Sequence, residues 1–274
     1  MPKIKLQNGY TLNYKDVGNG FPIIIVHGTP SSSDEFLEFI HIMQARYRLI
    51  ACDHIGFGES DKPEKFSYHI TEHQNNFTEF MQQLNLNKFN IIIHDFGGII
   101  ALPFILANLH KINNLVISNS WAWKMSQIEY FPNWMRSLMA SKLTRYLYLE
   151  KNFSARFFVK LAWGNYSPLT KEKHDKYKSK FKTAQERHGT WGFAQALCNE
   201  NDTIWKIESQ LSKLNSLNVL LLWGGADKLI TTKSMRYWQI LLPNAKIKSL
   251  EKVGHFLYDE AAILCADELN KFIL

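Results

Sequence analysis

Three residues that could work together as a nucleophile, an acid and a histidine each follow a predicted strand: Asp95, Asp227 and His255. Asp95 ends an apolar run and precedes two glycines and an apolar helical pattern, which predicts a tight strand-to-helix turn. Because such turns lie together at one edge of a parallel sheet, we expect the three side chains to form a catalytic triad. A carboxylate is already ionised at neutral pH, so Asp95 needs no base to become a nucleophile.

A second loop is predicted to complete the site. His27-Gly28-Thr29-Pro30 directly follows the apolar strand expected at 22–26. In this position a backbone N–H can join the N–H of the residue after the nucleophile to form an oxyanion hole. The expected donors are the N–H groups of Thr29 and Phe96. We interpret His27 and His94 as structural, because the triad leaves no role open for either.

The elements that must position these residues alternate between strand and helix signals over the first 120 residues. This arrangement predicts a mostly parallel sheet with helices on both faces. Glycine-rich turns predict antiparallel hairpins around Asn8-Gly9 and Gly18-Asn19-Gly20. The expected strands are 10–15, 22–26, 47–52, 89–93, 114–118, 217–223 and 246–250, and the expected helices are 33–45, 71–84, 98–109, 233–241 and one from about 257.

The segment 121–212 differs from its surroundings. Strand signals disappear there, helical signals dominate, and the segment holds six of the eight tryptophans. We therefore expect an inserted helical cap at 121–212 and a discontinuous α/β core formed by 1–120 and 213–274. The segment also contains 15 Lys and Arg against 8 Asp and Glu, which accounts for the whole net charge of +7. We interpret these charges as a solvated helix face, with attraction of anionic ligands as the functional alternative.

Composition excludes several classes of protein. No groove-binding motif accompanies the basic charge, so we expect no nucleic-acid partner. Three cysteines without a paired spacing predict neither a disulfide framework nor a zinc site. We find no signal-peptide pattern and no apolar run of about 18 residues, so we expect a cytoplasmic protein without a membrane partner. The sequence does not predict an oligomeric state.

Motifs spread over nearly the whole chain outside the expected cap resemble one known family. They are His27-Gly28-Thr29-Pro30, 53–63, His94-Asp95-Phe96-Gly97-Gly98, 118–123, 223–227 and Gly254-His255. Together they resemble the haloalkane dehalogenase and epoxide hydrolase branch of the α/β-hydrolase fold. In some dehalogenases the acid follows an earlier strand, where this chain has Asn119-Ser120 without a carboxylate. Asp227 is therefore the expected acid.

The resemblance implies a two-step displacement. Asp95 would attack an electrophilic carbon and form an alkyl ester, and His255, oriented by Asp227, would activate a water that hydrolyses this ester. The reaction would need no metal and no organic cofactor. The aromatic cap implies a small apolar organic substrate, with water as the second reactant.

The chain differs from the usual dehalogenase pattern at the positions that bind the leaving halide. That family usually supplies N–H donors from a tryptophan after the nucleophile and from an asparagine after the His-Gly pair, whereas this chain has Phe96 and Thr29. Trp121 and Trp123 are the candidate replacement donors and substrate-binding residues, and packing at the cap hinge is the alternative role for each. The Thr29 hydroxyl is a smaller candidate.

Haloalkane dehalogenation is the leading hypothesis, and epoxide hydrolysis is the runner-up. Epoxide hydrolases of the branch protonate the opening oxygen with two cap tyrosines. A carboxylesterase fits less well because the elbow has no serine, and a ligand-binding scaffold would not need all three triad residues. A light-emitting oxygenase would require dioxygen. The cap tyrosines available for epoxide opening are Tyr130, Tyr146, Tyr148, Tyr166 and Tyr177.

Overall fold

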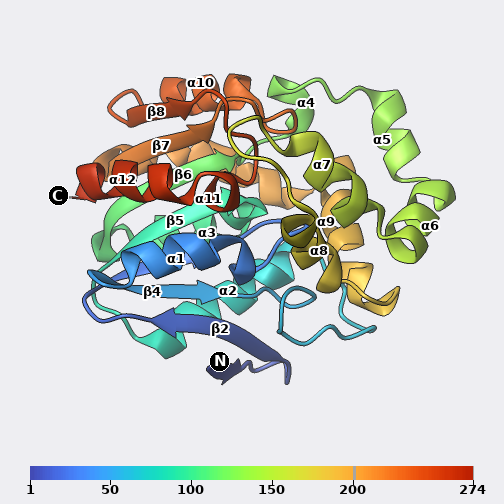
Figure 1. Cartoon of the computed structure of the whole chain (residues 1–274), viewed down its shortest axis with the longest axis horizontal. Coiled ribbons are helices and arrows are strands. Elements are labelled where there is room, and N and C mark those ends of the chain that lie inside the picture. The colour runs from blue at the N-terminus through green and yellow to red at the C-terminus, as the bar shows by residue number, and fades with distance from the viewer. Residues whose placement is uncertain (200–201, 274) are drawn as a thin grey trace.

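An eight-stranded, mostly parallel sheet forms the centre of the computed structural model, which describes residues 1–199 and 202–273 (Figure 1). The strand order is β1-β2-β4-β3-β5-β6-β7-β8, and all pairs from β4 onward in this order are parallel. The predicted α/β architecture is therefore confirmed. The strands are β1 (Lys3–Lys5), β2 (Thr11–Val17), β3 (Phe21–Val26), β4 (Tyr47–Cys52), β5 (Phe89–Asp95), β6 (Ile112–Ser120), β7 (Asn218–Gly224) and β8 (Lys246–Leu250).

One of the two predicted hairpins is wrong. β1 and β2 form an antiparallel hairpin around Asn8-Gly9, as expected. β2 does not pair with β3 across the second glycine turn, because both strands pair with β4 from opposite sides. The turn crosses the start of β4 so closely that a Cβ on Gly18 would lie 2.3 Å from the Tyr47 carbonyl oxygen. Gly18 therefore permits a crossing of the chain, and its positive φ of 84° does not indicate a hairpin here.

Helices cover both faces of the sheet, and each face has its own apolar core. On one face α2, α3 and α10 pack against side chains that alternate along the strands. On the other face α1, α11 and α12 do the same. The elements of these two layers are η1 (Ser33–Phe36), α1 (Leu37–Met43), α2 (Ile70–Leu84), α3 (Phe96–Ala107), η2 (Leu109–Lys111), α10 (Thr232–Leu241), α11 (Leu257–Glu260) and α12 (Ala262–Ile273).

A group of helices between β6 and β7 in the sequence lies beside the end of the sheet toward which the β4 arrow points (Figure 1). The segment contributes no strand within its described residues. Its last element, η5, contacts α3 of the sheet domain. The elements are α4 (Met125–Ile128), α5 (Asn133–Met139), α6 (Lys142–Lys151), the π-helix η3 (Ser154–Phe158), α7 (Val159–Ala162), α8 (Lys171–Ser179), η4 (Gln185–Arg187), α9 (His188–Cys198) and η5 (Thr203–Ser216).

Part of the basic charge of this helical group is paired with carboxylates of the sheet domain. Lys180 Nζ lies 2.7 Å from an oxygen of Asp34 and 2.6 Å from an oxygen of Glu59. Lys176 Nζ lies 2.6 Å from an oxygen of Asp259. These lysines therefore connect the helical group to the sheet domain. None of the helices in the described ranges is both long and apolar enough to cross a bilayer.

Candidate active site

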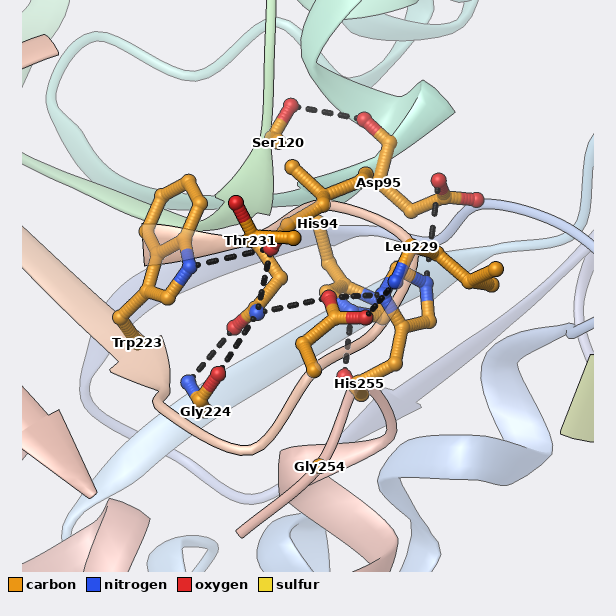
Figure 2. Close-up of polar contacts among 12 residues, drawn as sticks. His94, Asp95, Ser120, Trp223, Gly224, Leu229, Thr231, Gly254 and His255 are labelled. Carbon is orange, nitrogen blue, oxygen red and sulfur yellow. Dashed lines mark hydrogen bonds and ion pairs between the residues drawn. The ribbon is translucent and has the colours of Figure 1, made fainter. Parts of the chain in front are cut away.

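The backbone at Asp95 forms a sharp turn between β5 and α3. Asp95 has φ 51° and ψ −128°, a combination that non-glycine residues rarely adopt and that costs about 1–3 kcal/mol. The Ser120 hydroxyl donates a hydrogen bond of 2.7 Å to the Asp95 carbonyl oxygen. The turn directs the Asp95 side chain out of the sheet toward His255 (Figure 2).

Glycines permit the close approach of three segments around this turn. A Cβ on Gly97 would lie 2.2 Å from the Val26 carbonyl oxygen, so α3 begins almost in contact with the end of β3. A Cβ on Gly28 would lie 2.0 Å from Oδ2 of Asp95. Larger residues at either position would displace the carboxylate or the loop beside it.

The structure brings Asp95, Asp227 and His255 together. Nδ1 of His255 donates to Oδ2 of Asp227 at 2.7 Å, and Nε2 of His255 lies 3.7 Å from Oδ1 of Asp95. Nε2 has no hydrogen-bond partner within the described chain. The imidazole is 1% exposed and Asp95 is 5% exposed, so both lie in a site largely shielded from solvent.

Three donors hold the Asp227 carboxylate. Besides His255, the Leu229 N–H donates to Oδ1 at 2.7 Å and the Asn119 amide donates to Oδ2 at 2.8 Å. The Asn119 side chain is itself fixed, because its oxygen accepts the Gly224 N–H at 2.7 Å. This supporting contact of Asn119 was not predicted from the sequence. The amide in the position of a possible acid was the available signal.

Burial and neighbouring charges shift the pKa of both reactive groups. Burial raises the pKa of Asp95, and the nearby His255 and His94 and the N–H groups of Thr29 and Phe96 only partly oppose it. Burial lowers the pKa of His255, but the charge and hydrogen bond of Asp227, followed by the charges of Asp95 and Glu35, outweigh it and raise this pKa to about 9. At neutral pH the imidazole of His255 is therefore protonated.

The loop predicted to form the oxyanion hole contacts Asp95 directly. The Thr29 N–H donates to Oδ2 of Asp95 at 2.7 Å. The Phe96 N–H, at the start of α3, also favours the charged carboxylate. Oδ2 is thus held by backbone, whereas Oδ1 faces His255. This difference leaves Oδ1 available for attack on a substrate carbon.

Aromatic rings pack against Phe96, the residue after Asp95. The Phe96 ring lies between Trp121 and Phe193, with centroids 4.9 and 4.6 Å away. Trp121 is buried, and its Nε1–H has no hydrogen-bond partner among the described residues. The same holds for the hydroxyl oxygen of Thr29. The Thr29 hydroxyl, on the residue whose N–H contacts Asp95, and the Trp121 Nε1–H, on a ring that contacts Phe96, thus remain unpaired within the described residues. Leaving such groups buried is costly, and a polar ligand would relieve it.

Trp123 occupies a different environment from Trp121. Its ring packs against Tyr237 and Trp238 of α10, with centroids 4.6 and 5.1 Å away. Its Nε1–H is also buried and unpartnered within the described residues. The ring contacts nevertheless agree with the packing role that the sequence analysis gave as the alternative.

The five tyrosines considered for epoxide opening do not form a pair above Asp95. Tyr130, Tyr146 and Tyr166 are 73%, 49% and 47% exposed. The hydroxyl of Tyr177 donates to Asp259 at 2.9 Å, and its ring packs on Phe256.

The fifth tyrosine, Tyr148, lies among aromatic rings of the helical group. It packs against Phe153, Phe158 and Trp191. The structure thus provides no pair of tyrosine hydroxyls at the nucleophile among these five candidates.

A second pair of polar residues lies behind the triad and was not predicted as part of the site. His94 Nε2 donates to the His255 carbonyl oxygen at 2.9 Å, and His94 Nδ1 lies 3.2 Å from Oε1 of the buried Glu35. No sequence motif marks Glu35, which falls at the start of a predicted helix. No cluster of three or more His, Cys, Asp or Glu side chains suited to a metal ion occurs in residues 1–199 and 202–273.

The chain is similar to several characterised proteins over most of its length. A cis-3-alkyl-4-alkyloxetan-2-one decarboxylase of Shewanella oneidensis is 24% identical, and the match covers 93% of this chain and 83% of the relative. Haloalkane dehalogenase 2 of Mycobacterium bovis is 24% identical, with 91% and 87% covered. A soluble epoxide hydrolase of Corynebacterium is 25% identical, with 97% and 94% covered.

Solved structures share the fold. Haloalkane dehalogenase DbeA from Bradyrhizobium elkani superposes with a TM-score of 0.85 at 17% identity, covering 97% of this chain and 94% of that one. An esterase from Exiguobacterium antarcticum superposes with a TM-score of 0.82 at 17% identity, covering 99% and 98%. The model of the alpha/beta hydrolase fold matches residues 22–262. The resemblance to the dehalogenase and epoxide hydrolase branch is therefore confirmed, and the chain belongs to the α/β-hydrolase fold family.

Proposed function

We propose that this chain is a hydrolase with Asp95 as its nucleophile, that it forms a covalent alkyl ester, and that its substrates are haloalkanes. The observation that supports the proposal most strongly is that the two carboxylate oxygens of Asp95 have different contacts. Oδ2 accepts the Thr29 N–H at 2.7 Å, while Oδ1 lies 3.7 Å from Nε2 of His255. Oδ1 can attack the substrate carbon, and the backbone N–H on Oδ2 can later stabilise the oxyanion that forms on Oδ2.

The two steps follow from this arrangement. Oδ1 attacks the carbon that bears the halogen, the carbon–halogen bond breaks, and the halide leaves with the bonding electrons. The ester removes the negative charge of Asp95, which lowers the pKa of His255 and releases its proton to solvent. Neutral His255 then takes a proton from a water that attacks the ester carbonyl. The alcohol departs, and the Asp95 carboxylate and the imidazolium are restored.

The unpaired donors beside Phe96 supply a site for the leaving halide. The Trp121 Nε1–H and the Thr29 hydroxyl are buried and unpaired within the described residues. Each could donate to an anion that forms near Oδ1. A charge-assisted hydrogen bond of this kind contributes about 1.5–3 kcal/mol, roughly tenfold to a hundredfold in rate. This contribution would replace the side-chain N–H that a tryptophan would supply in the position of Phe96.

The placement of the tyrosines favours a halide over an epoxide. An opening epoxide oxygen needs a proton, and the five candidate tyrosines place no hydroxyl pair at the nucleophile. A halide needs no proton, only hydrogen-bond donors. We also propose that residues 121–212 act as the cap over this site and that residues 1–120 and 213–274 form the core.

Halide release from a panel of small bromo- and chloroalkanes tests the substrate class. The proposal predicts one equivalent of halide and one of alcohol per turnover, with no added metal or cofactor. Turnover of epoxides with no halide release across the panel would transfer the assignment to epoxide hydrolysis. An Asp95→Asn variant should release no halide, which excludes a contaminating activity.

A further inference from the structure

A second carboxylate–imidazole pair lies directly behind the triad. Glu35, on η1, is 1% exposed, and His94 is fully buried at the end of β5. Oε1 of Glu35 lies 3.2 Å from Nδ1 of His94, and Oε2 accepts a hydrogen bond from the Ser31 hydroxyl. Neither Oε1 nor Nδ1 has another polar partner within the described chain. The two-step mechanism above uses neither residue.

The other nitrogen of His94 reaches the catalytic histidine. Nε2 of His94 lies 2.9 Å from the main-chain carbonyl oxygen of His255, and the two rings are 4.8 Å apart (Figure 2). A carbonyl oxygen can only accept, so Nε2 must carry a proton and donate it. The contact therefore fixes the tautomer of His94. Nδ1 is left to face the carboxylate of Glu35.

This geometry requires one proton between Glu35 and His94. Two unprotonated acceptors 3.2 Å apart would repel each other in a buried site, where no water screens them. Burial opposes ionisation of Glu35, yet the charge and hydrogen bonding of His94 lower the pKa of this carboxyl below its usual value. Because the lowered pKa favours the carboxylate form of Glu35, we assign the shared proton to Nδ1 of His94. A charged donor makes a stronger hydrogen bond than a neutral one.

The bond from His94 complements the other contacts that hold His255. The His255 N–H donates to the Ala162 carbonyl oxygen at 2.8 Å, and its side chain donates to Asp227 at 2.7 Å. The carbonyl oxygen is the remaining main-chain polar group of the residue. His94 donates a hydrogen bond to this oxygen, and it lies on β5, the strand that also carries Asp95. The base and the nucleophile are thus connected through one rigid strand.

We propose that Glu35 is a positioning residue: it holds a proton on Nδ1 of His94, and the resulting imidazolium fixes the His255 carbonyl and thereby the imidazole relative to Asp95. Its kinetic consequence rests on the proposed function, because His255 acts only in the second step. Glu35 does not touch the reacting atoms. Removing its charge should therefore slow ester hydrolysis and leave ester formation unchanged.

The first test needs no substrate. Nitrogen-15 NMR of the imidazoles at neutral pH should show both nitrogens of His94 protonated in the unmodified protein. Glu35→Gln keeps the size and the polar contacts of the side chain but removes its charge, so Nδ1 of His94 should lose its proton. A neutral His94 in the unmodified protein, or an unchanged doubly protonated His94 in the variant, would overturn the proposal. This result stands whether or not the protein turns over haloalkanes.

The second test separates the two chemical steps. With a bromoalkane that the protein turns over, rapid-quench kinetics of Glu35→Gln should show unchanged ester formation and hydrolysis slowed about tenfold. Equal slowing of both steps, or of neither, would contradict the proposal. His94→Gln keeps a neutral donor without the imidazolium and should give the same selective loss if Glu35→Gln does not fold.

A matched control uses another buried histidine. His73 packs among aromatic rings, including Phe66 and Phe193, and neither of its nitrogens has a hydrogen-bond partner among the described residues. His73→Phe should leave both rates and the His94 signals unchanged. Selective slowing of hydrolysis by this variant would show that the loss of any buried histidine has the same effect, and the role assigned to Glu35 would fail.

Discussion

Nε2 of His255 lies 3.7 Å from Oδ1 of Asp95, too far for a direct hydrogen bond and close enough for strong electrostatic attraction. The same contact has opposite consequences in the two proposed steps. Before the reaction the carboxylate keeps the imidazole protonated. Once Asp95 is esterified the attraction disappears, and the imidazole can act as a base. Formation of the ester would thus prepare the residue that hydrolyses it.

This relationship predicts a pKa change that can be measured directly. Asp95→Asn resembles the uncharged ester, and it should lower the pKa of His255 from about 9 because one of the charges that raises it is removed. A proton NMR titration of the imidazole in both proteins gives the two values. An equal or higher pKa in Asp95→Asn would show that Asp95 does not hold the proton.

The pH dependence of ester hydrolysis follows with a defined sign. Only neutral His255 is a base, so the rate should rise with pH and level off above the pKa of His255 in the ester. Asp95 is uncharged in that state, so this pKa lies below the value of about 9 in the free protein. Single-turnover hydrolysis rates measured between about pH 5 and 10 check this. A rate that falls as pH rises through this range would contradict a base role.

Trp121→Phe tests the donor for the leaving group. The change keeps an aromatic ring against Phe96 but removes the Nε1–H, so ester formation should slow roughly tenfold to a hundredfold. Hydrolysis of the ester should not change. Trp123→Phe is the matched control, because this ring packs on α10, and it should leave both steps unchanged. Halide release kinetics distinguish the two; equal effects would remove the assignment to Trp121.

Asn119 is expected to support the acid. Asn119→Gly removes the amide that donates to Asp227, so ester hydrolysis should slow about tenfold while ester formation is retained. Asn119→Ala should slow hydrolysis equally but reduce stability more, since φ at this position is 37°. Thermal unfolding and single-turnover rates separate these effects. Unchanged hydrolysis in Asn119→Gly would leave Asn119 with a structural role alone.

Gly28→Ala tests the need for close contact between the oxyanion loop and the nucleophile. The added Cβ would lie 2.0 Å from Oδ2 of Asp95, so the carboxylate must move away from the Thr29 N–H. We expect turnover to fall by about a hundredfold, since small displacements of reacting groups have large effects. Gly9→Asn, in a turn where a Cβ meets nothing within 4 Å, is the control and should retain full turnover. Near-normal turnover by Gly28→Ala would contradict the role of the loop.

The sequence predicted the bounds of some strands correctly. β4 and β8 have the predicted bounds, 47–52 and 246–250. Strand pairing was less predictable. A hairpin and a crossing both use glycines with positive φ, and only the neighbouring β4 decides between them.

The site was predictable where a local motif carries the chemistry and not where a distant partner does. Asp95, Asp227 and His255 each follow a strand at a turn, and the fold brings them to one edge. Glu35 belongs to no recognisable motif, and its contact with His94 on β5 is formed only in the folded structure. Likewise, Trp121 contacts Phe96 whereas Trp123 packs on α10, and this difference depends on tertiary contacts.

The most direct measurement is the mass of a variant that cannot complete the second step. His255→Phe, incubated with a bromoalkane that the unmodified protein turns over, should gain the mass of one alkyl group on Asp95 and release one equivalent of bromide. The double variant Asp95→Asn, His255→Phe should gain nothing. An alkyl group on another residue, or no adduct in a folded His255→Phe protein, would contradict the covalent mechanism.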